Sequence, residues 1–207
     1  MRYVAAWLSA VIFAVFILQL LYSSEHFVLI DELKFSEPWR LLTSIFAHGS
    51  VPHLLNNLFA LLLFGLILEG RIGAKRTLQL FLFAGVVVNL FSPYPRSLGA
   101  SGAIFGILGA LIALRPGMVV YVSYIPMPMF VAGIIWLLQD LFGVFYPTDV
   151  ANLAHISGLF IGMAFGLFWR GQFGDKISFF EKKKKPPRDH YLERQLDAWE
   201  KEHMFRK

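Results

Sequence analysis

Apolar residues in this chain gather in long blocks that are separated by polar connections. Six blocks can be distinguished, at residues 4–21, 54–68, 77–91, 101–114, 119–142 and 150–169. Because the apolar residues fill these blocks instead of following amphipathic stripes, the pattern is typical of helices that lie in lipid. A spanning helix needs about 20 apolar residues, so blocks two, three and four are short for that purpose. The pattern predicts an all-α membrane protein in which six transmembrane helices form a bundle.

Positive charges between the blocks orient the predicted helices. Arg71, Lys75 and Arg76 lie between blocks two and three, Arg115 lies between four and five, and Arg170 follows block six. Lysine and arginine concentrate on the cytoplasmic side of membrane helices. Both chain termini are therefore expected in the cytoplasm, and blocks two, four and six run from outside to inside. We expect a multi-pass protein of the plasma membrane.

The composition agrees with this interpretation. Of the 207 residues, 57% are hydrophobic and 16% are charged, against about 25% charged in soluble domains. The net charge of +5 does not indicate nucleic-acid binding, because much of it lies in the lysine run 182–185, where it would contact anionic lipid. We expect residues 1–174 to form the membrane domain and residues 175–207 a basic cytoplasmic tail containing a weak amphipathic helix. The absence of cysteine excludes thiol chemistry and disulfides.

Three polar residues fall at one depth in the predicted bilayer. Asn57 is 14 residues before Arg71, Ser101 is 14 before Arg115, and His155 is 15 before Arg170. At 1.5 Å per residue each lies ~21–23 Å above the cytoplasmic surface, within a hydrocarbon core of ~30 Å. Polar side chains at such a depth are costly and usually functional. The proline-containing segment 92–100 cannot continue a helix, so Ser101 is expected to begin one at the floor of a hydrated pocket.

These residue types fit acyl transfer. A serine hydroxyl needs a base, and His155 is the histidine that lies level with Ser101 on another helix. We see no acid at that depth, with Asp149 lying above, so the prediction is a Ser-His dyad. Asn57, His53 one turn away and the Ser101 N–H are candidate oxyanion donors, whereas the neighbouring Asn56 is expected to point elsewhere.

Small residues support close packing of the helices that carry this pair. Block six has a stripe of small residues that includes Gly158, and block four offers Gly102 and further glycines, so the two backbones should approach closely. Phe105, one turn below Ser101, is placed to stack on the imidazole of His155. In the first external connection, Arg40 is expected to form an ion pair with an acidic residue, either Glu69 or Glu37.

Five short motifs together resemble the rhomboid family of intramembrane serine proteases. They are Trp39-Arg40, H-x4-H-x3-N at 48–57, E-x-R-x-G at 69–73, G-x-S-G at 99–102 and A-H-x2-G-x3-G at 154–162. The resemblance implies a minimal six-helix prokaryotic type, with Ser101 as nucleophile, His155 as base, and His53, Asn57 and the Ser101 N–H at the oxyanion. It also implies that His48 is structural and that Gly99, Gly102, Phe105 and Gly158 support the site. Many bacterial relatives carry tyrosine at the position of Phe105.

The resemblance further implies a substrate that is itself a single transmembrane helix, cut near its outer end. Water is expected to enter the site from the extracytoplasmic side and the substrate laterally, between blocks two and five. We expect no metal, no other cofactor and no nucleic-acid partner; membrane lipid is the expected surroundings, and the oligomeric state is open.

Other interpretations stay open from the sequence. Ser101 could bond a helix carbonyl, His155 could be a packing residue, and Asn57 could join two helices. The whole chain could be a catalytically inactive relative that binds membrane helices. It could also be a small transporter or metal carrier that uses His48, His53 and His155, although the thiols and level acids of a good ligand set are missing.

Overall fold

The structure is a computed structural model that describes residues 3–122, 124–146, 150–173, 195 and 199. Most of the described residues are helical. Their helices and four short strands follow one another in the order α1, η1, β1, η2, α2, α3, η3, α4, α5, β2, α6, β3, β4, α7 and α8. The long helices are α1 (Val4–Leu21), α3 (Val51–Ala60), α5 (Ala74–Leu90), α6 (Ser101–Leu114), α7 (Met129–Phe145) and α8 (Asn152–Phe173). The short pieces are η1 (Ser24–His26), η2 (Asp31–Leu33), α2 (Arg40–Thr43), the π-turn η3 (Leu61–Gly65) and α4 (Leu66–Ile72).

Three helical stretches of the described residues are long and apolar enough to cross a bilayer. They are Val4–Leu21, the continuous stretch Val51–Ile72 made of α3, η3 and α4, and Asn152–Gln172. Two shorter apolar helices, α6 and α7, pack between or beside them. The chain is therefore a helical, multi-pass membrane protein, and α1 and α6 have the bounds that the apolar blocks predict.

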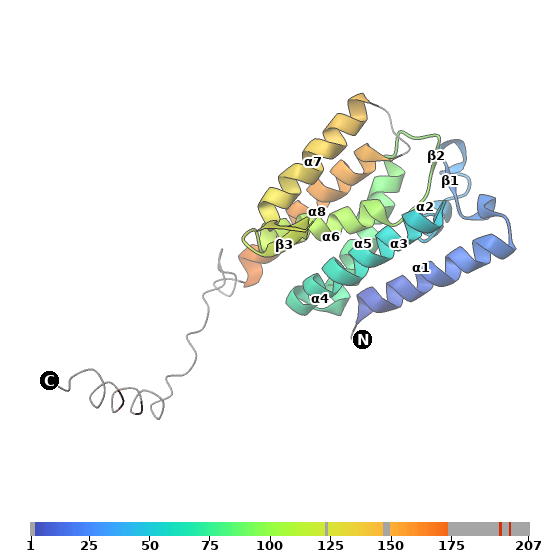
Figure 1. The fold of residues 1–207 in the computed structure, drawn as a ribbon. Coiled ribbons are helices and arrows are strands. Elements are labelled where there is room, and N and C mark those ends of the chain that lie inside the picture. Colours follow the sequence, from blue (N-terminus) through green and yellow to red (C-terminus); the bar gives the residue numbers. More distant parts are fainter. Residues whose placement is uncertain (1–2, 123, 147–149, 174–194, 196–198, 200–207) are drawn as a thin grey trace.

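Helix α6 runs through the middle of the bundle, between α5 and α8 (Figure 1). Eleven of its 14 residues are buried. The contact with α8 depends on glycine, because a Cβ on Gly162 would lie 1.8 Å from the Gly106 carbonyl oxygen and one on Gly158 would lie 2.1 Å from that of Gly102. The prediction that small residues let these two helices approach closely is confirmed.

The prediction for the fifth block is wrong over residues 119–128. Residues 119–142 do not form one helix: β3 (Val119–Val122) and β4 (Ile125–Pro128) make an antiparallel hairpin, and α7 begins only at Met129. Pro126 and Pro128 explain the difference, because proline lacks an N–H and forces the residue before it into an extended conformation. The turn is tight, with Tyr124 at φ 68°.

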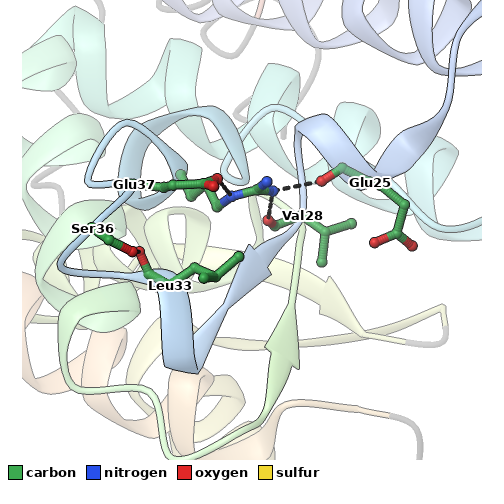
Figure 2. Close-up of polar contacts among 6 residues, drawn as sticks. Glu25, Val28, Leu33, Ser36 and Glu37 are labelled. Atoms are coloured by element: carbon green, nitrogen blue, oxygen red, sulfur yellow. Dashed lines mark hydrogen bonds and ion pairs between the residues drawn. The ribbon is translucent and has the colours of Figure 1, made fainter.

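The first connection, between α1 and α3, is tied down by short elements and one buried arginine. Strand β1 (Leu29–Ile30) pairs with β2 (Arg96–Ser97) at the end of the bundle opposite to α4 and β3 (Figure 1). The guanidinium of Arg40, 8% exposed, donates to the carbonyls of Glu25 and Val28 at 2.5 and 2.8 Å and pairs with the Glu37 carboxylate (Figure 2). Of the two ion-pair partners that the sequence left open, Glu37 is the one observed.

Glu69, the other acidic candidate, instead accepts a hydrogen bond from the Ala5 backbone N–H at 3.2 Å. This contact fixes the first turn of α1 against α4, since that N–H has no partner within its own helix. The predicted tail helix, with Leu192, Leu196 and Trp199, lies almost entirely outside the described residues.

Candidate active site

A cavity of about 1490 Å³ opens into the bundle among α3, α6, α7 and α8. Ser101, His155, His53 and Asn57, which sequence reasoning placed at or near one depth, all line it together with Phe105. Three separate helices, α3, α6 and α8, therefore bring the candidate residues to one hollow. On its other side the cavity continues past η3 and β3.

Ser101 is the first residue of α6, and the backbone that leads into it is not helical. Gly99 has φ +124°, a conformation that side chains rarely adopt, and a Cβ there would lie 2.7 Å from the His53 ring. The Gly99 N–H donates to the Ser44 carbonyl at 2.8 Å, which holds this turn in place. The serine hydroxyl thus sits where the first N–H groups of a helix have no partner in the helix itself.

The imidazole of His155 is held from two directions. The Phe105 ring stacks on it, with centroids 4.2 Å apart and an interplanar angle of 6°, which confirms the expected stacking. In addition, Nδ1 of His155 lies 3.0 Å from Oδ1 of Asp140, whose side chain is 8% exposed. The expectation that no acid lies level with His155 is therefore wrong.

Asp140 was not predicted as a site residue, although one feature of the sequence points to it. It is the only charged residue in the apolar stretch 119–142, and an ionisable group inside a membrane segment marks a functional site by default.

Asn57 and His53, the two side chains predicted to donate to the oxyanion, already make contacts with other residues. Asn57, 6% exposed, donates one of its amide protons to the His53 carbonyl at 3.1 Å within α3, so one further N–H remains for another acceptor. The ring of His53 contacts the ring of His48, with centroids 4.9 Å apart. Asn56 also lines the cavity, so the expectation that it points elsewhere is wrong.

His48 lies in the connection that precedes α3, outside the membrane-spanning helices, and is 2% exposed. Its backbone N–H donates to the Gln19 side chain at 2.9 Å, and its Nδ1 lies 3.3 Å from the Phe46 carbonyl. Burial and the neighbouring His53 lower the pKa of His48 to about 4, against an ordinary 6.5. It is therefore a neutral ring that supports His53 at physiological pH.

A tyrosine holds the start of the helix that carries His155. Tyr94, which lines the cavity, accepts a hydrogen bond at 3.2 Å from the N–H of Leu153 in the first turn of α8, two residues before His155.

Within the described residues no hydrogen bond joins the Ser101 hydroxyl to His155, although both residues line the same cavity. Catalytic hydrogen bonds are often long in the absence of substrate and tighten when it binds. No group of three or more histidine or acidic side chains in the described part of the chain is arranged to hold a metal ion.

The fold and the cavity define a multi-pass helical membrane protein with a serine and a histidine facing one internal hollow. The family model for the Rhomboid domain matches residues 35–172, two thirds of the chain. The chain therefore belongs to the rhomboid family.

Individual relatives cover the same region. Rhomboid protease GluP of Bacillus subtilis is 38% identical over 154 residues, and Rhomboid protease GlpG of Haemophilus influenzae is 27% identical over 134 residues. RHOMBOID-like protein 6, mitochondrial, of Arabidopsis thaliana is 30% identical over 136 residues. These matches take in 68%, 63% and 63% of this chain and 29%, 69% and 43% of the respective relatives, so the chain spans less than half the length of two of the three.

Proposed function

We propose that this chain is an intramembrane serine endopeptidase that cleaves transmembrane helices near their outer ends with the pair Ser101 and His155. The observation that carries the proposal is the shared cavity: a hydroxyl at a helix start and an imidazole on a neighbouring helix face the same hollow inside an apolar bundle. Membership of the rhomboid family, with two protease-named relatives, supports it.

The proposed reaction runs in two halves. Nε2 of His155 takes the Ser101 proton as the oxygen attacks the peptide carbonyl, and the imidazolium then gives this proton to the leaving amine. Water, activated by the same nitrogen, adds to the acyl-enzyme carbonyl and releases the acid and Ser101. The Ser101 N–H, the free amide proton of Asn57 and the ring of His53 are the donors for the oxyanion.

We propose six membrane spans in residues 1–174, with both ends of the chain in the cytoplasm and residues 175–207 as a basic cytoplasmic tail. The start of α1 and the end of α8 lie at the same end of the bundle in Figure 1, which supports termini on one side. The positive charges of Arg71, Lys75, Arg76 and Arg115 in the connections support the cytoplasmic side for this end. In this orientation the cavity opens to the extracytoplasmic face of the plasma membrane.

The substrate is proposed to enter laterally, between α3 and α7. The cavity is lined on one flank by Ala60 and Leu63 and on the other by Trp136. The rings of Phe64 and Trp136 meet edge to face across this flank, with centroids 6.0 Å apart. A helix that enters here must unwind before its backbone reaches Ser101, so residues that weaken helices near the cut should favour cleavage.

Reconstitution tests the proposal directly. The purified full chain is placed in vesicles with a single-span substrate, beside the variants Ser101→Ala and His155→Ala. We expect cleavage by the wild type alone, at a bond near the outer end of the substrate helix. A folded wild type that binds the substrate but leaves it intact would contradict the protease function and favour an inactive, helix-binding relative.

A further inference from the structure

The carboxylate of Asp140 on α7 lies 3.0 Å from Nδ1 of His155, and the other ring nitrogen, Nε2, is the one that the proposed reaction uses. We propose that Asp140 is the positioning residue of the site: its carboxylate accepts a hydrogen bond from the Nδ1–H of His155 and so keeps Nε2 unprotonated toward Ser101. The inference rests on the proposed function of the same cavity and extends it from two side chains to three.

Geometry gives the first reason. The Nδ1 to Oδ1 distance is 3.0 Å, and the side chains of His155 and Asp140 are only 13% and 8% exposed. A carboxylate buried among apolar helices is costly unless it is paired and hydrogen bonded. Because an ionised carboxylate can only accept hydrogen bonds, its contact with Nδ1 places the proton on that nitrogen.

The stacked phenylalanine cannot do this work alone. Phe105 holds the plane of the imidazole, at 6° to its own ring. A rotation of 180° about the bond to the ring leaves that plane unchanged but exchanges the positions of nitrogen and carbon. Only a polar partner in the plane distinguishes the two orientations, and Asp140 is the partner that the described residues provide.

A close contact next to the pair fixes Asp140 opposite His155. A Cβ on Gly143 would lie 2.4 Å from the Asn152 side chain, so the two helices approach closely at this level. From there Asp140 is three residues back along α7 and His155 is three residues on along the antiparallel α8. The same spacing on both helices brings the carboxylate and the imidazole together.

The hydrogen bond to Asp140 connects His155 to α7, the helix beside the proposed substrate entry. Trp136, which lines the cavity, lies one helical turn before Asp140 on α7. A substrate that displaces the first half of α7 leaves the hydrogen bond between Asp140 and His155 intact only if the contact between Gly143 and Asn152 keeps the second half of α7 in place. The reactivity of His155 therefore depends on the position of α7.

The test compares Asp140→Asn and Asp140→Leu with Gln139→Ala, an exposed neighbour on the same helix. All are full chains in vesicles, and kcat, KM and thermal midpoint are measured for each. A carboxylate that holds the tautomer of a catalytic histidine contributes up to about 10⁴-fold in kcat. We expect both Asp140 variants to lose at least about 10-fold in kcat with KM within about two-fold, while Gln139→Ala resembles the wild type. Unchanged kcat in Asp140→Leu would overturn the inference.

A spectroscopic measurement separates this inference from the proposed function. In protein with ¹⁵N-labelled histidine, the His155 resonances are identified by their loss in His155→Gln. We expect Nδ1 to carry a proton in the wild type, whether or not any substrate is cleaved, and to lose its fixed protonation in Asp140→Leu. An unprotonated Nδ1 in the wild type would overturn the role of Asp140, and a protein that fails to cleave but shows the protonated Nδ1 would instead count against the protease function alone.

Discussion

Gly158 offers the sharpest test of the packing that joins the two halves of the site. It lies on α8, three residues after His155, and faces Gly102, the residue after Ser101. A methyl group added by Gly158→Ala would lie 2.1 Å from the Gly102 carbonyl oxygen and 3.3 Å from Cβ of Phe105. Ordinary contacts between heavy atoms are about 3.5 Å, so the two backbones must separate by roughly 1 Å.

This separation sets the expected loss. A displacement of about 1 Å between reacting groups costs about 100-fold in rate, and overpacking costs about 1–3 kcal/mol in the free energy of unfolding. We therefore expect kcat of Gly158→Ala to fall about 100-fold while the protein stays folded, because folded proteins generally have about 5–15 kcal/mol of stability.

The assay is the initial cleavage rate in vesicles, measured with the denaturation midpoint. Gly171→Ala is the matched control, because a Cβ at Gly171 on the same helix meets nothing within 4 Å. Cleavage by Gly158→Ala at the wild-type rate, with a wild-type midpoint, would refute the reasoning that glycine contact sets the distance between α6 and α8.

Three further predictions concern residues around the site. Replacing Phe105 by tyrosine should keep the rate within about two-fold, whereas alanine should lower it by roughly 2- to 10-fold through loss of stacking, as initial rates would show; equal rates for both would contradict this. Arg40→Ala should lower the free energy of unfolding, measured by denaturation, by about 3 kcal/mol, because it leaves the buried Val28 carbonyl, the Glu25 carbonyl and the Glu37 carboxylate without this partner; an unchanged midpoint would contradict it. Because the pKa of His48 is about 4 in the folded protein and 6.5 in the unfolded chain, its contribution to stability should be constant above pH 6.5 and fall by up to about 3 kcal/mol as the pH drops toward 4; His48→Gln should remove this part of the pH dependence of unfolding.

The sequence predicts the spanning helices well where they are apolar on all sides and free of proline. α1 and α6 have the predicted bounds because nothing in them competes with the helix. The same rule fails at Pro126 and Pro128, where apolar, β-branched residues form a hairpin instead of the start of a helix. Hydrophobicity alone does not distinguish the two, since a short apolar run is compatible with a strand as well as with a helix; in the hairpin Val119, Tyr121 and Ile125 are exposed.

Asp140 could not be placed next to His155 from the sequence because the hairpin was not predicted. Counted as one helix from Arg115, Asp140 would lie 25 residues higher, ~37 Å along the axis and beyond a hydrocarbon core of ~30 Å. The hairpin occupies residues 119–128, so α7 begins at Met129 and carries Asp140 only 11 residues along, ~16 Å. Its contact with His155 is visible only once the hairpin is known.

Labelling of the serine by a fluorophosphonate tests the central claim most directly. The full chain in vesicles is treated with the reagent, and the modified residue is located by mass spectrometry, beside His155→Ala and Gln139→Ala. The account predicts that Ser101 is modified in the wild type and in Gln139→Ala, and that the modification is lost in His155→Ala. A folded wild type in which Ser101 stays unmodified, or equal modification of Ser101 without His155, would contradict it.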